Sequence, residues 1–223
     1  MTYTTAEESG KNWTLKLGDS CERLAELDED SVDLSVYSTP FASLFTYSPS
    51  LRDLGNASTR DEFIEHYGFI IREVLRVTKP GRISCVHVQQ LTSTKTTHGI
   101  IGLTDFRGQV IQAHVDNGWI FHGEVTVNKD PQAQAIRTKA QALMFVTKNR
   151  DSSMTRPALA DYLLMFRKPG DNAVQIKNDV SNEEWIDWAQ PVWLDIRETK
   201  TLNERVAREE ADERHICPLQ LDF

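Results

Sequence analysis

Apolar and polar positions follow two periods along the first half of the chain, one typical of strands and one typical of helices. The strand-like runs are Trp13–Leu17, Val32–Tyr37 and Ile83–Val88. Helical spacing follows Ser20 and is strongest over Asp61–Val77, where Thr59 or Asp61 is placed to cap the helix. This alternation of strands and helices predicts an α/β domain with a mostly parallel sheet.

The second half of the chain continues the alternation less regularly. The pattern predicts a helix over Phe106–His114, a strand over Trp119–Val127, a helix over Arg137–Lys148 and a strand over Tyr162–Arg167. Turns are predicted at Lys79-Pro-Gly81 and Lys168-Pro-Gly170. Residues 42–60, rich in Ser, Asn and Gly, are predicted to form a long loop, of a length that is often functional. We expect one α/β domain over residues 1–170 and a less regular segment over 171–223.

Composition is that of an ordinary globular protein, with 223 residues, 39% hydrophobic and 26% charged. Apolar runs are too short for a membrane-spanning helix, and the first residues lack a signal pattern, so we expect a cytoplasmic protein. Three widely spaced cysteines, at positions 21, 85 and 217, form no C-x-x-C pair. The sequence therefore predicts neither a disulfide framework nor a metal site.

Charge is distributed unevenly along the chain. The net charge is −8, yet residues 52–168 carry 16 basic and 11 acidic side chains. The basic residues between 129 and 156 are Lys129, Arg137, Lys139, Lys148, Arg150 and Arg156. A local basic surface is enough for contacts with nucleic-acid phosphates, although a solvated charged face explains the pattern equally well.

The strand over Val32–Tyr37 leads into a polar and aromatic turn, Ser38-Thr-Pro-Phe41. In open α/β sheets, ligands bind at the carboxyl ends of strands near a topological switch point. This turn is therefore the best candidate for a site. It either binds a flat substrate or is an ordinary strand end without a function.

Several segments occur together in one order along almost the whole chain. They are LGDS (17–20), VDLSVYSTPF (32–41), LRVTKPGR (75–82), DYLLMFRKPG (161–170) and ERHICPLQL (213–221). This order resembles the exocyclic-amino DNA methyltransferases of the permuted β type, which methylate cytosine N4 or adenine N6. The resemblance implies a Rossmann-like sheet and S-adenosylmethionine (SAM) as the methyl donor.

The resemblance assigns the chemistry to the turn. Ser38 and a backbone carbonyl at Thr39 would accept the hydrogens of the target amino group, Pro40 would fix the backbone, and Phe41 would stack on the flipped base. Transfer would be direct, without a covalent cysteine or a metal. A serine at position 38 slightly favours cytosine N4, while adenine N6 stays open.

Cofactor and DNA contacts are also implied by the resemblance. Asp19 matches a position near SAM, although helix capping explains it equally well. The residues that match the motif at the methionine end of SAM are His215, Pro218 and Gln220. Tyr47 and Arg52 in the long loop would close over the base or pin the loop. The six basic residues of positions 129–156 would contact double-stranded DNA.

The sequence departs from the family at two places. Thr39 stands where the family has a first proline, and the 11 glycines include no G-x-G, so the glycine-rich SAM loop expected after the last motif is missing. These departures predict an incomplete sheet that needs a second chain or a homodimer to cover an exposed edge. They also leave open a different function, a catalytically silent DNA-binding or regulatory relative.

Overall fold

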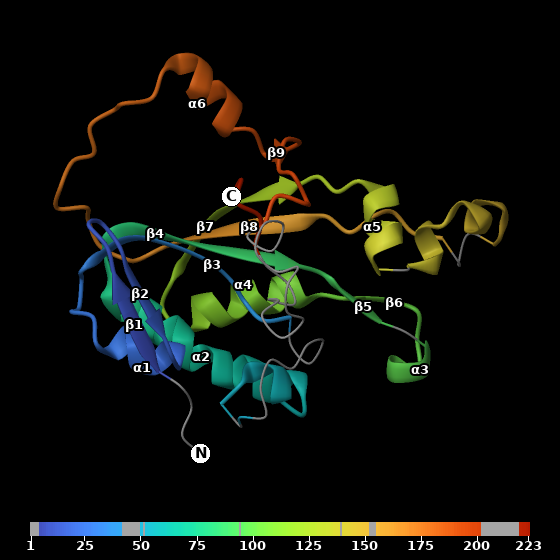
Figure 1. Cartoon of the computed structure of the whole chain (residues 1–223), viewed down its shortest axis with the longest axis horizontal. Helices are drawn as coiled ribbons and strands as arrows, with labels where there is room; N and C mark the ends of the chain where they lie inside the picture. The colour runs from blue at the N-terminus through green and yellow to red at the C-terminus, as the bar shows by residue number, and fades with distance from the viewer. Residues whose placement is uncertain are drawn as a thin grey trace. The chain divides into compact units, whose positions relative to one another are not determined.

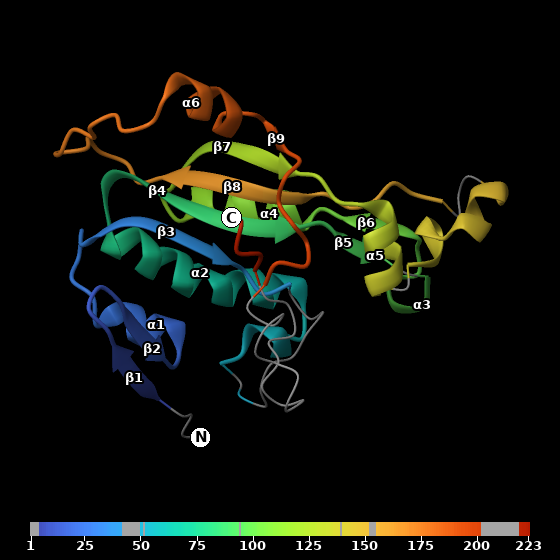
Figure 2. The same cartoon turned by 45° about the horizontal axis from the view of Figure 1, so that its top comes forward.

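The protein is described by a computed structural model that covers residues 5–41, 50, 52–93, 95–138, 140–151, 155–201 and 219–223. A mixed sheet has the strand order β3-β4-β8-β7-β9. Its strands are β3 (Val32–Ser38), β4 (Thr78–Gln89), β7 (Ile120–Val127), β8 (Asp161–Arg167) and β9 (Val192–Trp193). The pairs β3–β4 and β7–β9 are parallel, whereas β8 runs in the opposite direction (Figure 2). The expected α/β fold class is confirmed.

Two hairpins and several helices complete the described elements (Figure 1). The hairpins pair β1 (Ala6–Ser9) with β2 (Thr14–Leu17) and β5 (Leu91–Ser93) with β6 (Gly102–Thr104). The α-helices are α1 (Ser20–Ala25), α2 (Arg60–Val77), α3 (Lys95–His98), α4 (Phe106–Asp116), α5 (Pro131–Thr138) and α6 (Asn182–Trp188). Short 3₁₀ helices are η2 (Leu54–Asn56), η3 (Gln141–Leu143) and η4 (Phe145–Asn149).

The chain divides into two compact units that interleave along the sequence. Unit 1 comprises Met1–His87, Asp105–Gly123 and Leu164–Asn178. Unit 2 comprises Val88–Thr104, Glu124–Leu163 and Asp179–Phe223. The strand-end turn predicted from the sequence belongs to unit 1, whereas the basic residues between 129 and 156 belong to unit 2.

The core of unit 1 lies between helices α2 and α4 and one face of the sheet. Helix α2 begins because the Thr59 hydroxyl accepts the backbone N–H of Glu62 at 3.1 Å. Its apolar face buries Phe63, Tyr67 and Ile71 completely. The His114 ring of α4 stacks on Phe166 of β8, with ring centroids 3.9 Å apart. This aromatic layer fixes the helices beneath the strands that carry the candidate site.

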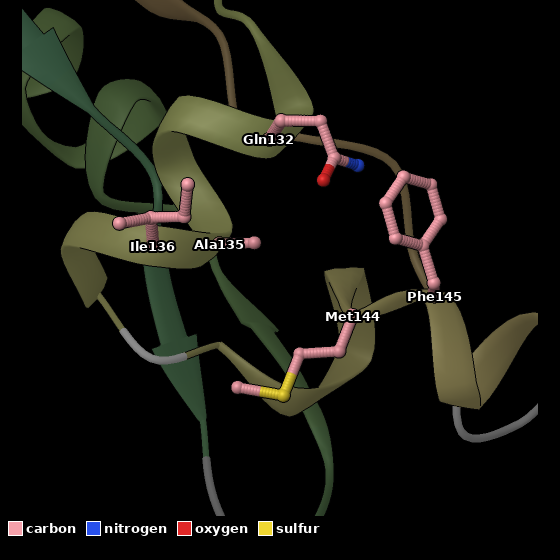
Figure 3. A pocket seen from close by; sticks show the side chains of 5 residues that line it. All are labelled: Gln132, Ala135, Ile136, Met144 and Phe145. Atoms are coloured by element: carbon pink, nitrogen blue, oxygen red, sulfur yellow. The ribbon is translucent and has the colours of Figure 1, made fainter.

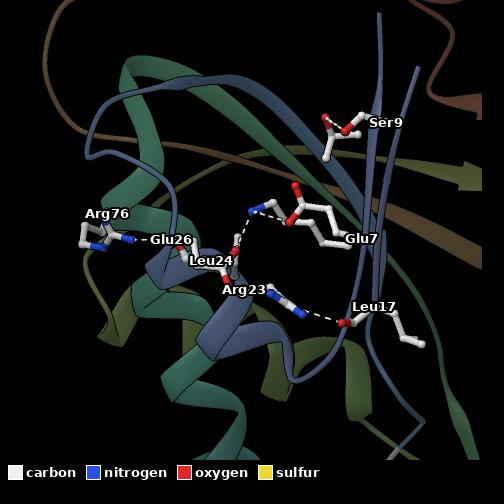
Figure 4. Close-up of polar contacts among 9 residues, drawn as sticks. Glu7, Ser9, Leu17, Arg23, Leu24, Glu26 and Arg76 are labelled. Atoms are coloured by element: carbon white, nitrogen blue, oxygen red, sulfur yellow. Dashed lines mark hydrogen bonds and ion pairs between the residues drawn. The ribbon is translucent and has the colours of Figure 1, made fainter. Parts of the chain in front are cut away.

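The first hairpin and α1 are held to the end of α2 by arginine side chains (Figure 4). Arg23 donates to the Leu17 carbonyl at 3.0 Å and pairs with Glu26 at 2.6 Å. Arg76 donates to the Leu24 carbonyl at 2.8 Å. Because these donors satisfy carbonyls at the ends of short elements, α1 stays in place although none of its residues is buried.

Strand β3 lies at one end of the strand order, and its outer edge pairs with no strand in the part of the chain that the structure describes. Tyr37 points toward the α2–α4 core, so Leu34 and Val36 point to the other face by strand alternation. Leu34 is 57% exposed and Val36 is 47% exposed. An edge strand with two half-exposed apolar side chains is a ready surface for another strand.

Two local predictions were wrong. The turn expected at Lys79-Pro-Gly81 lies inside β4, where the register with β3 shifts and Gly81 adopts φ +75° while its N–H donates to the Lys168 carbonyl at 3.1 Å. The helix expected over Arg137–Lys148 is not seen in the described residues after Thr138, which instead form the 3₁₀ helices η3 and η4. Helix α5 instead begins at Pro131, because the Asp130 carboxylate accepts two backbone N–H groups at 2.7 and 2.8 Å.

Candidate functional site

The strand register of β3 and β4 builds the candidate site in unit 1. Ser38 is the last residue of β3 and pairs with His87, near the end of β4. Because the two strands are parallel, both residues lie at the same carboxyl edge of the sheet. The sequence interpretation included His87 in a buried strand but gave it no function. Its signal was a single imidazole within the apolar run Ile83–Val88, at the edge where α/β sheets bind ligands.

The Ser38 hydroxyl lies closest to the imidazole of His87. Its oxygen is 3.1 Å from His87 Nδ1, compared with 3.4 Å from the His87 carbonyl and 3.5 Å from the Thr39 carbonyl. The two carbonyl distances are long for an O–H···O bond, which usually measures about 2.5–3.0 Å. The imidazole, which belongs to a residue only 6% exposed, is therefore the best partner for the hydroxyl.

Phe41 contacts the same imidazole. The ring centroids of Phe41 and His87 are 6.4 Å apart and the planes meet at 84°. This edge-to-face arrangement is favourable between aromatic rings. Phe41 is partly exposed. The turn therefore places a hydroxyl and an aromatic ring beside one buried imidazole, which suits a flat polar ligand.

Thr39 anchors the turn to the core, with only 2% of its surface exposed. Its hydroxyl donates to the Pro40 carbonyl at 3.2 Å and also bonds with Tyr67. The Tyr67 hydroxyl lies 3.1 Å from that of Tyr37. The Thr39 hydroxyl, which a proline would lack, thus joins a buried hydrogen-bond network.

The network beneath the turn is neutral. Burial raises the pKa of Tyr37 to about 12, and it raises the pKa of Tyr67 well above the ordinary value. Burial also lowers the pKa of His114 to about 4. His114 Nδ1 donates to the Val110 carbonyl at 2.8 Å, which leaves Nε2 to accept from the Tyr37 hydroxyl at 3.4 Å. Uncharged groups therefore support the turn.

Asp19 and Arg52 come together at the start of α1. One Asp19 carboxylate oxygen accepts the Cys21 N–H at 2.9 Å and the Glu22 N–H at 3.3 Å, which caps the helix. The other oxygen pairs with Arg52 at 3.3 Å, and Arg52 also pairs with the Glu22 carboxylate. Capping is the structural role that the sequence allowed for Asp19, and pinning is the one that it allowed for Arg52.

The residues that the resemblance assigned to SAM are only partly described. Gln220 is 8% exposed, and its Oε1 is buried without a hydrogen-bond partner among the described residues. His215 and Pro218 lie outside the described residues, as do Tyr47 and Lys139. Close to Gln220 in sequence, the Asp222 carboxylate pairs with Arg197 at 2.8 Å and Lys200 at 2.5 Å, which lowers its pKa.

The structure separates the basic residues predicted to contact DNA. Lys129 is not on the surface: its side chain is 1% exposed and pairs with the Asp161 carboxylate at 2.6 Å. The expected DNA contact from Lys129 is therefore corrected to a buried ion pair. Lys148 and Arg150 are exposed, and Arg137 belongs to α5. Arg156 is partly buried, which lowers its pKa, and it donates to the Pro157 carbonyl at 3.0 Å.

A small apolar hollow lies in the same unit as the exposed cations (Figure 3). Its volume is about 170 Å³, and it is lined by Gln132, Ala135, Ile136, Met144 and Phe145. It is smaller than the roughly 300 Å³ at which small-molecule sites begin. Phe145 is 67% exposed and lies three residues before Lys148. An exposed apolar side chain of the hollow, Phe145, is thus close in sequence to an exposed cation, Lys148.

Comparison with solved structures identifies the fold. A proposed DNA modification methylase from Thermus thermophilus, in complex with S-adenosyl-L-methionine, superposes with a TM-score of 0.61 and 20% identity, covering 81% of this chain and 65% of that protein. Another structure of the same methylase gives a TM-score of 0.59, with 20% identity, 81% of this chain and 66% of that protein. The chain therefore spans about two thirds of the length of this neighbour.

Other comparisons are weaker. The cytosine-N4-specific DNA methyltransferase PvuII reaches a TM-score of 0.46 at 20% identity, covering 76% of this chain and 59% of that protein, which is too low to support an argument. No protein-family model and no curated protein sequence matches the chain. The similarity thus defines the class of fold, the Rossmann-like α/β fold of SAM-dependent methyltransferases, at an identity that shows the fold alone.

The described residues lack two features, a membrane-spanning helix and a metal cluster. No helix among them has the length and apolar character to cross a membrane. Within the same ranges, no cluster of three or more His, Cys, Asp or Glu side chains is arranged to hold a metal ion.

Proposed function

We propose that the protein is a SAM-dependent DNA methyltransferase that methylates an exocyclic amino group, cytosine N4 or adenine N6. The observation that carries this proposal is the turn at the carboxyl end of β3, where the Ser38 hydroxyl and the Phe41 ring both contact His87. The same turn was the candidate site in the sequence, and the fold around it is that of methyltransferases.

The chemistry of an exocyclic amino group explains why these residue types suit the reaction. The amino lone pair is delocalised into the base, so the nitrogen is a poor nucleophile. Acceptors for its hydrogens, the Ser38 oxygen and the Thr39 carbonyl, favour a pyramidal nitrogen whose lone pair is available for methylation. Phe41 would stack on a base flipped out of the duplex, and Pro40 would hold both groups in position. Positioning supplies most of the acceleration.

SAM would supply the electrophilic methyl group. Of the described residues that the resemblance assigns to SAM, Gln220 fits this role better than Asp19. Gln220 offers a buried oxygen without a partner among the described residues, which suits an N–H donor such as the ammonium of SAM. Asp19 fits less well, because both of its carboxylate oxygens already have partners at the start of α1. We therefore assign Gln220, rather than Asp19, to the cofactor.

Double-stranded DNA is the proposed substrate, and Lys148 and Arg150 are the described side chains best placed to contact its backbone. Both are exposed, and both follow the exposed Phe145. Phosphate contacts of this kind position a protein on DNA without reading its sequence. Replacing both cations with methionine is expected to weaken binding to all duplexes alike and to reduce the salt dependence.

The open edge of β3 is the proposed docking place for a second polypeptide that carries the glycine-rich SAM segment. Two observations support it: the half-exposed Leu34 and Val36, and the position of β3 at the end of the strand order among the described residues. A segment that adds a strand would pair with the open backbone edge of β3 and complete the sheet.

The test is transfer of labelled methyl from SAM to duplex DNA, by the chain alone and with candidate partner chains. We expect transfer once the β3 edge is covered, and we expect weak SAM binding by the chain alone in calorimetry. Micromolar SAM binding by the isolated chain would contradict the need for a partner. Salt-dependent DNA binding without transfer under any condition would instead identify a catalytically silent DNA-binding protein.

A further inference from the structure

We propose that His87 is a positioning residue that turns the Ser38 hydroxyl into an acceptor for the target amino group. The inference rests on the proposed function. It adds a residue to which neither the sequence motif nor the fold assigns a role, and it concerns the direction in which one proton points.

The β3–β4 register holds the His87 imidazole beside the Ser38 hydroxyl. Ser38 and His87 are register partners on parallel strands, so the position of the imidazole beside the hydroxyl is fixed by the sheet. The Ser38 oxygen lies 3.1 Å from His87 Nδ1, a shorter distance than to either nearby carbonyl. His87 is 6% exposed, so bulk water competes little for this contact.

The tautomer of His87 decides where the Ser38 hydroxyl proton points. A serine hydroxyl has one proton and two lone pairs, and it accepts an amino hydrogen well only if its own proton points elsewhere. In a neutral imidazole with its proton on Nε2, Nδ1 carries a lone pair that can accept the Ser38 proton. Both lone pairs of the Ser38 oxygen then face away from the imidazole. The opposite tautomer, with Nδ1 protonated, would donate to Ser38 and turn the hydroxyl proton toward the substrate.

His87 also contacts the ring of Phe41. The Phe41 ring meets the imidazole edge to face, with centroids 6.4 Å apart. One side chain therefore orients the acceptor and braces the ring that would stack on the base. Losing His87 should affect the reaction rate more than the affinity for DNA, because both effects act at the reacting base and neither acts on the phosphate backbone.

The first experiment reads the tautomer directly and requires no turnover. Long-range ¹H–¹⁵N spectra of the chain with ¹⁵N-labelled histidines separate protonated from unprotonated ring nitrogens, and His87→Asn assigns the signal among the six histidines. The expected result is an unprotonated Nδ1 and a protonated Nε2 in the wild type, with the Nδ1 signal shifting in Ser38→Ala. A protonated Nδ1, or a spectrum that Ser38→Ala leaves unchanged, would overturn the proposal.

The second experiment compares two replacements of His87 in the methyl-transfer assay, under the conditions in which the wild type transfers methyl. Asparagine places an oxygen close to the Nδ1 position and keeps an acceptor, whereas leucine fills similar space without one. His87→Leu is expected to lower kcat about tenfold with little change in KM for DNA, the scale of one hydrogen bond. His87→Asn should keep more than about half of the activity, because its acceptor is retained. Equal losses in both variants would mean that the imidazole only fills space.

The two experiments separate this inference from the proposed function. If no methyl reaches DNA under any condition, with or without a chain that covers the β3 edge, the proposed function fails, and the ring tautomer still shows whether His87 accepts from Ser38. If transfer occurs but Nδ1 carries the proton, the function stands and the role of His87 is refuted. Thermal unfolding of both variants checks that a lower rate does not reflect loss of fold.

Discussion

Lys129 allows a direct test of the buried ion pair, because the sequence predicted a DNA contact for this residue and the structure buries it. Its ammonium lies 2.6 Å from the Asp161 carboxylate, with side chains 1% and 5% exposed. The other Asp161 oxygen accepts from the Gln89 amide at 2.7 Å. Lys129→Met removes the cation but leaves the carboxylate buried, with the neutral amide still donating to it.

The size of the effect follows from these contacts. Two unit charges at this separation attract by about 6 kcal/mol at an effective dielectric constant of about 20. Much of that energy offsets desolvation, whereas removing one partner of a buried pair costs about 3–5 kcal/mol. We therefore expect Lys129→Met to lower the free energy of unfolding by about 3–5 kcal/mol. Lys129→Met/Asp161→Leu should regain most of this loss, because no charge stays buried alone.

Urea unfolding followed by circular dichroism measures the effect, and fluorescence anisotropy with a labelled duplex measures DNA binding. Lys148→Met is the matched control: it should change stability by less than about 0.5 kcal/mol while weakening DNA binding at low salt. A Lys129→Met protein with wild-type stability and weakened DNA binding would refute the buried ion pair and restore the expectation made from the sequence.

Three further predictions concern the turn and its support. Phe41→Ala is expected to reduce methyl transfer strongly while duplex binding stays within about tenfold, because stacking on one base contributes about 1–3 kcal/mol; loss of all binding would make Phe41 a core residue. Thr39→Pro should raise methyl transfer if backbone freedom limits the site, whereas Thr39→Val, which removes only the hydroxyl bonded to Tyr67, should not. Burial lowers the pKa of His114 to about 4, so the unfolded chain binds the extra proton first as the pH falls. Stability should therefore be full above about pH 6.5 and fall by about 3 kcal/mol by about pH 4. His114→Gln, measured by urea unfolding across this range, should remove most of that fall, and an unchanged slope would contradict the assignment.

Elements with strong periodicity and clear caps were predictable from the sequence. Helix α2 was expected over Asp61–Val77 and occupies Arg60–Val77, and β3 was expected over Val32–Tyr37 and extends to Ser38. Both have several apolar residues at the spacing of their structure, so local pattern and tertiary burial agree. Helix α5 was missed because its start depends on a single cap at Asp130, which an apolar pattern does not show.

The site was predictable only in part. Ser38 and Phe41 follow a strand directly, so sequence neighbours alone place them at a sheet edge. The partner of Ser38 is 49 residues away, and only the β3–β4 register shows that His87 lies beside it. Lys129 illustrates the opposite failure, since a basic residue in a basic stretch gives no sign that a distant carboxylate will bury it.

The register between β3 and β4 also has a consequence for how this site tolerates change. The hydrogen-bond ladder between β3 and β4 sets the spacing of Ser38 and His87, although 48 residues separate them in the chain. A deletion of one residue between Ile83 and His87 would send the imidazole to the opposite face. The contact between Ser38 and His87 therefore depends on an unchanged number of residues from Ile83 to His87.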